Sequence, residues 1–217
     1  MIAALPEAAL ELWQAAVASP LDAPVFPDGC RDLIVNLPER GAPACFVSAL
    51  ADRVETVRLA AGDRLVGVRM RAGAQFEEPA LLAALAGRER FGAIDLLAAV
   101  GDVARVHPDV REALECLAAS PSLVIARAAL GVSERSLERL LTPRTGRRPA
   151  YWRSLARARR CARALGGVVP LIEVALDNGY ADQAHMTRDM RRWFGATPAR
   201  MRADPLRFAP LAASGHG

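Results

Sequence analysis

One stretch near the C-terminus carries side chains that could recognise nucleotide bases. In residues 183–194, Met186, Met190 and Trp193 follow the i, i+4, i+7 spacing of one helical face, which predicts core packing rather than a cofactor site. The opposite face of the helix then presents Ala184, Thr187, Arg188 and Arg191, and Gln183 lies in the first turn. In a major groove, Arg can pair with guanine and Gln with adenine, and a short Ala can contact a thymine methyl. The stretch therefore predicts a base-reading helix.

The segment before this helix fits a helix-turn-helix, and an earlier segment follows the same template. Residues 171–178 lead through Gly179 to Asp182, and residues 123–130 lead through Gly131 to Ser133 and a helix over 134–141. Glycine suits the left-handed turn between crossed helices, and Ser133 and Asp182 are good N-caps. In the first copy, Leu137, Leu140 and Leu141 share the core face. Its candidate DNA-contacting residues are Ser133, Arg135, Ser136, Glu138 and Arg139, and Asp182 joins them from the second copy.

A helix over residues 149–165 is predicted to connect the two copies, with Pro149 in its first turn. Seventeen residues span about 25 Å. Such a helix could hold two reading helices roughly one DNA turn, about 34 Å, apart. Trp152 and Leu155 fit its apolar stripe, and arginines line the other side. We expect Arg144, Arg147, Arg148, Arg157 and Arg160 to contact phosphates, while Arg153 and Arg163 fit a solvated face equally well.

Charge is divided unevenly along the 217 residues. Residues 1–110 hold 10 Arg against 15 acidic residues, and residues 111–217 hold 18 Arg against 9. The chain has no lysine, and this all-arginine usage weakens any inference from a single arginine. A basic half favours a polyanionic partner, although arginines on solvated helix faces would have the same composition.

The N-terminal half is predicted to be rich in strands. A short amphipathic helix is expected over residues 6–18, from the spacing of Leu10, Trp13 and Val17. Strands are expected over residues 31–37, 44–50, 54–60 and 64–71, with a hairpin loop at 61–63 joining the last two. Helices are expected over 79–86, 93–100 and 109–119. The predicted fold class is α+β, with a small β-rich domain at 1–106 and an all-α domain of two helix-turn-helix units joined by a central helix at 107–217.

Residues 109–202 resemble the DNA-binding domain of AraC/XylS-type transcriptional regulators. The resemblance is carried by GVSERSLERLL, by TGRRPAYWRSLARARRCARAL and above all by IEVALDNGYADQAHMTRDMRRWFGATPARMR. It implies two helix-turn-helix units that each place one helix into successive major grooves on one DNA face. The departures are Met186 and Met190, where the family usually has Phe, and Arg127, in the slot that Ala175 fills in the second unit. The N-terminal half resembles, less specifically, a short β-rich sensory domain found in a subgroup of these regulators.

Other functional classes find little support in the sequence. A cupin-like enzyme needs metal-binding His and Glu on strands, and the three histidines (His107, His185, His216) lie outside the strand-rich region. The four cysteines are scattered, which disfavours a zinc site and a methyl-accepting repair regulator, whose thiolates are clustered on zinc; a redox switch at Cys30 and Cys45 stays an alternative. We expect no catalytic residue, no metal and no cofactor, and we assign no cofactor-binding residue.

The expected partners and location follow from this interpretation. Double-stranded DNA is the main partner; RNA polymerase, an unidentified effector or protein at the N-terminal domain, and a second copy of the chain are further candidates. No run of about 18 apolar residues and no signal peptide is found, so we expect a cytoplasmic protein without a membrane segment.

Overall fold

The computed structural model describes residues 4–88 and 90–217, and the chain divides into two units that each have a core. The first unit is made of the residues up to Val25, Cys30–Leu50 and Thr56–Pro108. The second is made of Asp109–Gly217 and of two short segments, Phe26–Gly29 and Ala51–Glu55. Strands occupy the N-terminal half and helices follow, which confirms the predicted α+β fold class.

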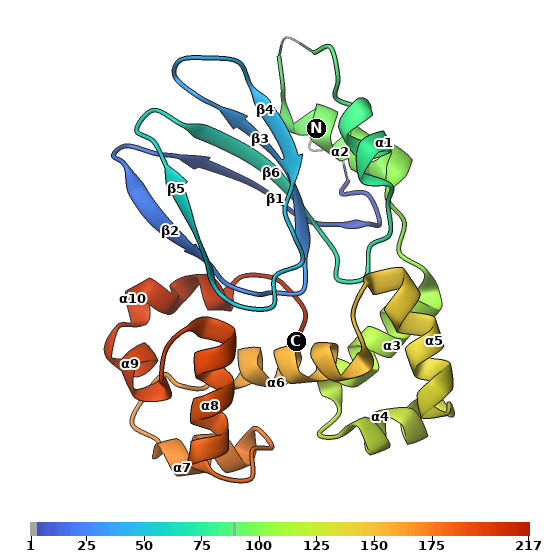
Figure 1. Ribbon diagram of the computed structural model, residues 1–217, viewed down its shortest axis with the longest axis vertical. Coiled ribbons are helices and arrows are strands. Elements are labelled where there is room, and N and C mark those ends of the chain that lie inside the picture. The colour runs from blue at the N-terminus through green and yellow to red at the C-terminus, as the bar shows by residue number, and fades with distance from the viewer. Residues whose placement is uncertain (1–3, 89) are drawn as a thin grey trace. The chain divides into compact units, whose positions relative to one another are not determined.

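A four-stranded antiparallel sheet with strand order β1-β6-β3-β4 forms the first unit, and β2 pairs separately with β5. The strands are β1 (Ala9–Ala16), β2 (Leu21–Val25), β3 (Arg31–Leu37), β4 (Ala44–Val47), β5 (Glu55–Leu59) and β6 (Arg64–Met70). One face of the sheet is apolar and packs against α1 (Glu78–Ala83) and α2 (Ala93–Val103), as Figure 1 shows. The fully buried residues of the core between the sheet and these helices include Leu33, Val35, Val68, Leu81, Leu96 and Val100.

The helix predicted over residues 6–18 was wrong, because these residues form β1. Trp13 pairs with Gly67 of β6, and a Cβ on Gly67 would lie only 2.3 Å from the indole. The indole Nε1 donates a hydrogen bond of 2.7 Å to Asp32 of β3. Pairing within the sheet thus overrides the helical spacing of the apolar residues.

The hairpin predicted around residues 61–63 was also wrong. A turn is present, in which the Asp63 amide donates to the Ala60 carbonyl. The two strands on either side do not pair with each other, because β6 lies between β1 and β3 while β5 pairs with β2. Val68 and Met70 of β6 are fully buried, whereas β5 is mostly exposed. The more apolar strand therefore takes the central position in the sheet.

Helices make up the described elements of the second unit, apart from its two short segments. They are α3 (Pro108–Ala119), α4 (Leu123–Leu130), α5 (Glu134–Thr145), α6 (Pro149–Arg163), α7 (Leu171–Asp177), α8 (Gln183–Phe194), α9 (Pro198–Ala203), α10 (Pro205–Phe208) and the 3₁₀ helix Ala209–Ala212. Figure 1 shows α6 running between the pair α4 and α5 and the pair α7 and α8. Helix α5 continues beyond the expected end at Leu141 to Thr145, through Pro143.

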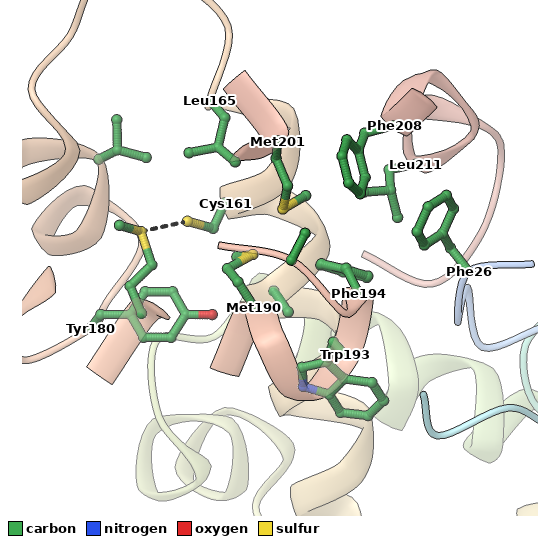
Figure 2. Close-up of a cluster of buried hydrophobic side chains, with 14 of the residues drawn as sticks. Phe26, Cys161, Leu165, Tyr180, Met190, Trp193, Phe194, Met201, Phe208 and Leu211 are labelled. Carbon is green, nitrogen blue, oxygen red and sulfur yellow. Dashed lines mark hydrogen bonds between the residues drawn. The ribbon is translucent and has the colours of Figure 1, made fainter. Parts of the chain in front are cut away.

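The core of the second unit lies around α6 and α8. Met186, Met190 and Trp193 are fully buried, which confirms the predicted core face of α8. Phe26, from the segment Phe26–Gly29, also belongs to this core (Figure 2). Its ring centroid lies 6.2 Å from that of Phe194 and 5.6 Å from that of Phe208. A residue from the N-terminal half of the sequence thus completes the core beneath the second helix-turn-helix.

A buried histidine makes the stability of the second unit depend on pH. His216 is 6% exposed, its Nε2 lies 3.0 Å from the Trp152 carbonyl oxygen, and its amide donates to the Asp28 carbonyl. The pKa of His216 is lowered to about 4, chiefly by burial; the hydrogen bond to the Trp152 carbonyl opposes this decrease, and the charges of Arg159 and Arg160 add to it. Since the unfolded chain binds the proton near pH 6.5 and the folded chain does not, stability is full above that pH and is lost as pH falls towards 4.

We therefore expect the free energy of unfolding to drop by about 3 kcal/mol between pH 6.5 and pH 4 through this group alone. The His216→Gln variant should lack this part of the drop, and denaturant unfolding at several pH values would measure it. His107→Gln is the matched control, because it removes an exposed histidine of the first unit. An identical pH profile for the His216 variant and the wild type would contradict the expectation.

Candidate nucleic-acid interface

Two helix-turn-helix units are present, and both have the predicted turn chemistry. Gly131 and Gly179 have φ angles of 64° and 75°, in the left-handed region that glycine adopts at little cost. Ser133 Oγ accepts a hydrogen bond from the Ser136 amide at 3.1 Å, and Asp182 Oδ1 accepts one from the His185 amide at 2.6 Å. Both predicted N-caps are confirmed. Each cap contributes about 1 kcal/mol and orients the first turn of the helix that follows.

The face of α8 opposite the core is exposed as its periodicity predicts. Gln183, Ala184, Arg188 and Arg191 are exposed, and Thr187 is half-buried. The Thr187 hydroxyl donates to the Gln183 carbonyl at 2.8 Å, so it is already used within the helix. The Arg188 guanidinium makes no ion pair or hydrogen bond with any described residue. Arg188 is therefore available to an external acceptor.

Helix α5 presents a smaller exposed set. Arg135 and Arg139 are exposed, whereas Ser136 and Glu138 are half-buried, and Ser133 uses its hydroxyl as the cap. Arg127 of α4 pairs with Glu134 at 2.6 Å and so ties the first turn of α5 to the preceding helix. The departure at position 127 thus has a structural role within this unit.

The turn between α5 and α6 carries two of the predicted phosphate-contacting arginines. Arg148 is exposed at the N-cap position of α6. Arg147 is half-buried; its guanidinium lies 3.8 Å from the Asp52 carboxylate and above the Tyr151 ring, 5.1 Å from the centroid. Asp52 comes from the segment Ala51–Glu55 of the same unit. Arg147 can bind a phosphate only in competition with this carboxylate.

One predicted phosphate contact requires correction, and a second is partly engaged within the unit. Arg157 is 7% exposed and pairs with Asp189 of α8 at 2.7 Å, and Arg160 donates a hydrogen bond to the Ala118 carbonyl at the end of α3. Arg153 also bonds inward, to the Pro121 carbonyl at 3.0 Å. Arg157 lies inside the unit, whereas Arg153 and Arg160 are half-buried and each give one hydrogen bond to a carbonyl of the same unit. Arg157 is therefore left out of the candidate interface, and Arg160 can bind a phosphate only with the part of its guanidinium that this bond leaves over.

Sequence reasoning missed two features of this region. Asp189 accepts hydrogen bonds from both Arg157 and the Tyr180 hydroxyl, and burial together with the Asp189 charge raises the pKa of Tyr180. No spacing rule links these three positions, because they come from different elements. Arg192 is exposed and lies four residues after Arg188, on the same face of α8. The i, i+4 spacing could have identified it.

The described residues offer little to a metal-dependent enzyme, a redox switch or a membrane protein. Among residues 4–88 and 90–217, no cluster of three or more His, Cys, Asp or Glu side chains could hold a metal ion. Cys30 is buried, and burial raises the pKa of the Cys45 thiol, which lowers its thiolate fraction. Within the same residues, every helix is too short or too polar to cross a bilayer.

Comparison with known proteins gives a match to a family profile described as a helix-turn-helix domain, over residues 127–204. No curated protein matches the sequence. Among solved structures, the chain is similar to ToxT from Vibrio cholerae. One ToxT structure aligns at 9% identity and a TM-score of 0.41, covering 88% of this chain and 94% of ToxT; another aligns at 8% and 0.43, covering 94% and 97%.

The matched range contains both turn glycines, both N-caps and the connecting helix α6. It also contains the segments that carry the family resemblance. Residues 127–204 therefore form a helix-turn-helix domain, which follows a β-rich N-terminal region.

Proposed function

We propose that the protein is a sequence-specific transcription regulator that reads successive major grooves with α5 and α8. The observation that carries this proposal is the exposed face of α8, where Gln183, Arg188 and Arg191 lie opposite a fully buried Met and Trp stripe. Arg135 and Arg139 of α5 offer a second, smaller reading face. We assign no catalytic step to any residue. Because a transcription regulator must reach the genome, we also propose that the protein is cytoplasmic.

The residues proposed at the DNA fall into three groups. Those proposed to face base edges or the groove are Arg135, Glu138, Arg139, Gln183, Ala184, Thr187, Arg188 and Arg191. Arg144, Arg147 and Arg148 are proposed to hold phosphates, and the exposed Arg192 joins this group. Ser133, Ser136 and Asp182 would contribute through the N-terminal turns of the reading helices, whose amides favour phosphate.

We further propose that the first unit modulates DNA binding through a small molecule, a protein partner or a second copy of the chain. A hollow of about 310 Å³ at one end of β1, β3 and β6 is large enough for a small ligand. It is lined by Gln14, Ala15, Ala16, Leu37, Arg64, Leu65 and Val66. RNA polymerase is the further partner expected of a regulator that activates transcription.

The salt dependence of DNA binding tests the proposed function. Each phosphate contact releases condensed counterions, so the logarithm of affinity should fall linearly with the logarithm of salt concentration. We expect Arg148→Ala to reduce this slope by about one and to weaken binding to all sequences alike. Fluorescence anisotropy on a duplex chosen by binding-site selection would give both quantities.

Arg58→Ala is the matched control, because Arg58 is a highly exposed arginine of the first unit, paired with Asp22. It removes the same charge and should leave the slope unchanged. A wild-type affinity that does not respond to salt, or a selection that yields no consensus, would overturn the proposed function.

A further inference from the structure

A buried charge cluster joins the connecting helix to the second reading helix. Arg157 of α6 donates from Nη2 to Asp189 Oδ2 at 2.7 Å, and the Tyr180 hydroxyl donates to the same oxygen at 3.1 Å. The Arg157 guanidinium also lies over the Tyr180 ring, 4.2 Å from its centroid. Arg157 is 7% exposed, Asp189 9% and Tyr180 2%. The cluster is thus cut off from solvent and from any DNA.

A second polar contact joins the same two helices about one turn away. Trp193 Nε1 donates to Ser154 Oγ at 3.2 Å. On α8 the two attachment points, Asp189 and Trp193, are four residues apart; on α6, Ser154 and Arg157 are three apart. Residues at these spacings share one helical face. Two directional bonds on facing stripes define both the axial position of α8 and its rotation about its own axis.

Rotation of α8 matters because the anchor and the reader are consecutive residues. Successive side chains on a helix are separated by about 100°. Asp189, held inward, therefore sets the direction in which Arg188 points outward. Apolar packing through Met186, Met190 and Trp193 supplies burial but little directional preference, since methionine adapts to irregular surroundings.

We propose that Arg157, Tyr180 and Asp189 form an orientation lock that makes base reading by α8 specific without touching DNA. The inference rests on the proposed function and deepens it, by assigning a positioning role in DNA recognition to three buried residues. Arg157 is then a positioning residue that acts through Arg188 and its neighbours on the exposed face.

The test must separate orientation from stability. Removing Arg157 alone would leave the Asp189 charge buried and unpaired, which can unfold the unit. The variant R157M/Y180F/D189L replaces the whole cluster by apolar groups, and Y180F is included because the hydroxyl would otherwise lose its acceptor. Such replacements often preserve or raise stability. The readout is the ratio of affinities for a selected duplex and a scrambled duplex, measured at one salt concentration with the full chain.

We expect the triple variant to keep its unfolding midpoint, its affinity for scrambled duplex and its salt slope, while the affinity ratio falls at least tenfold. The control is Arg159→Met, which removes another buried arginine of α6, one that bonds to the Pro27 and Ala213 carbonyls. It should keep the ratio. A folded triple variant that retains the wild-type ratio would overturn the lock.

A milder variant keeps the inference testable if the triple variant does not fold. Asp189→Glu preserves the charge pair but lengthens the anchor by one methylene, which must rotate or shift α8. The selected consensus should change or the affinity ratio should fall, and an unchanged consensus and ratio would overturn the lock. If wild-type protein itself shows no preference for any duplex, the proposed function fails first and the lock fails with it.

Discussion

Replacing Arg188 by alanine should flatten the preference at one or two base pairs of the selected site and leave affinity for scrambled DNA largely intact. Arg188 is exposed on α8 and makes no ion pair or hydrogen bond with any described residue. Its sequence neighbour Asp189 points inward and is already paired with Arg157. A bidentate arginine–guanine contact contributes about 1–3 kcal/mol of discrimination, roughly 5- to 150-fold. Binding-site selection with the variant measures the change position by position.

Arg192→Ala is the matched control for Arg188→Ala. It removes the same charge from the same face of α8, but in the last turn, and the N-terminal turns of a reading helix are the ones that reach base edges. We expect uniformly weaker binding and an unchanged consensus. Arg139→Ala should likewise flatten the preference at one or two base pairs, in the part of the site that α5 reads. If Arg188→Ala selects the wild-type consensus with uniformly lower affinity, the assignment of the reading face is wrong.

Phe26→Ala should destabilise the DNA-binding unit by about 3–5 kcal/mol, the usual range for removing a buried phenylalanine. Phe26 is 8% exposed and its ring packs against Phe194 at the end of α8 and Phe208 of α10 (Figure 2). Tryptophan fluorescence during denaturant unfolding would report the loss, because Trp152 and Trp193 lie in this unit and are almost fully buried.

The control is Phe46→Ala, since Phe46 lies on β4 and is 42% exposed. Its replacement should lower the free energy of unfolding far less than Phe26→Ala does.

The same core contacts predict the stability of an isolated fragment of residues 107–217, which lacks both Phe26 and the Val54 side chain that packs against this core. We expect that fragment to be less stable than the unit within the full chain. A fragment as stable as the full chain, or equal losses for the two phenylalanine variants, would contradict this account.

Most features of the helical half that the sequence predicted depend on interactions between residues close together in the chain. The turn glycines, the Ser133 and Asp182 caps and the buried stripe of α8 depend on residues within a few positions of one another, and all were found where the pattern placed them. Helix α4 and helix α8 have the predicted bounds. The exposed face of α8 followed from the same periodicity.

Tertiary structure decided the remaining features. Residues 9–16 have helical spacing yet form β1, because pairing with β6 and the fit of Trp13 over Gly67 outweigh a weak local preference. Arg157 has the spacing of a solvated helix face, but it is buried and paired with Asp189 of α8. Phe26 lies more than 160 residues before Phe194, so its place in that core follows only from how the chain folds back. Whether an arginine meets solvent or a buried carboxylate depends on long-range packing, which sequence periodicity does not contain.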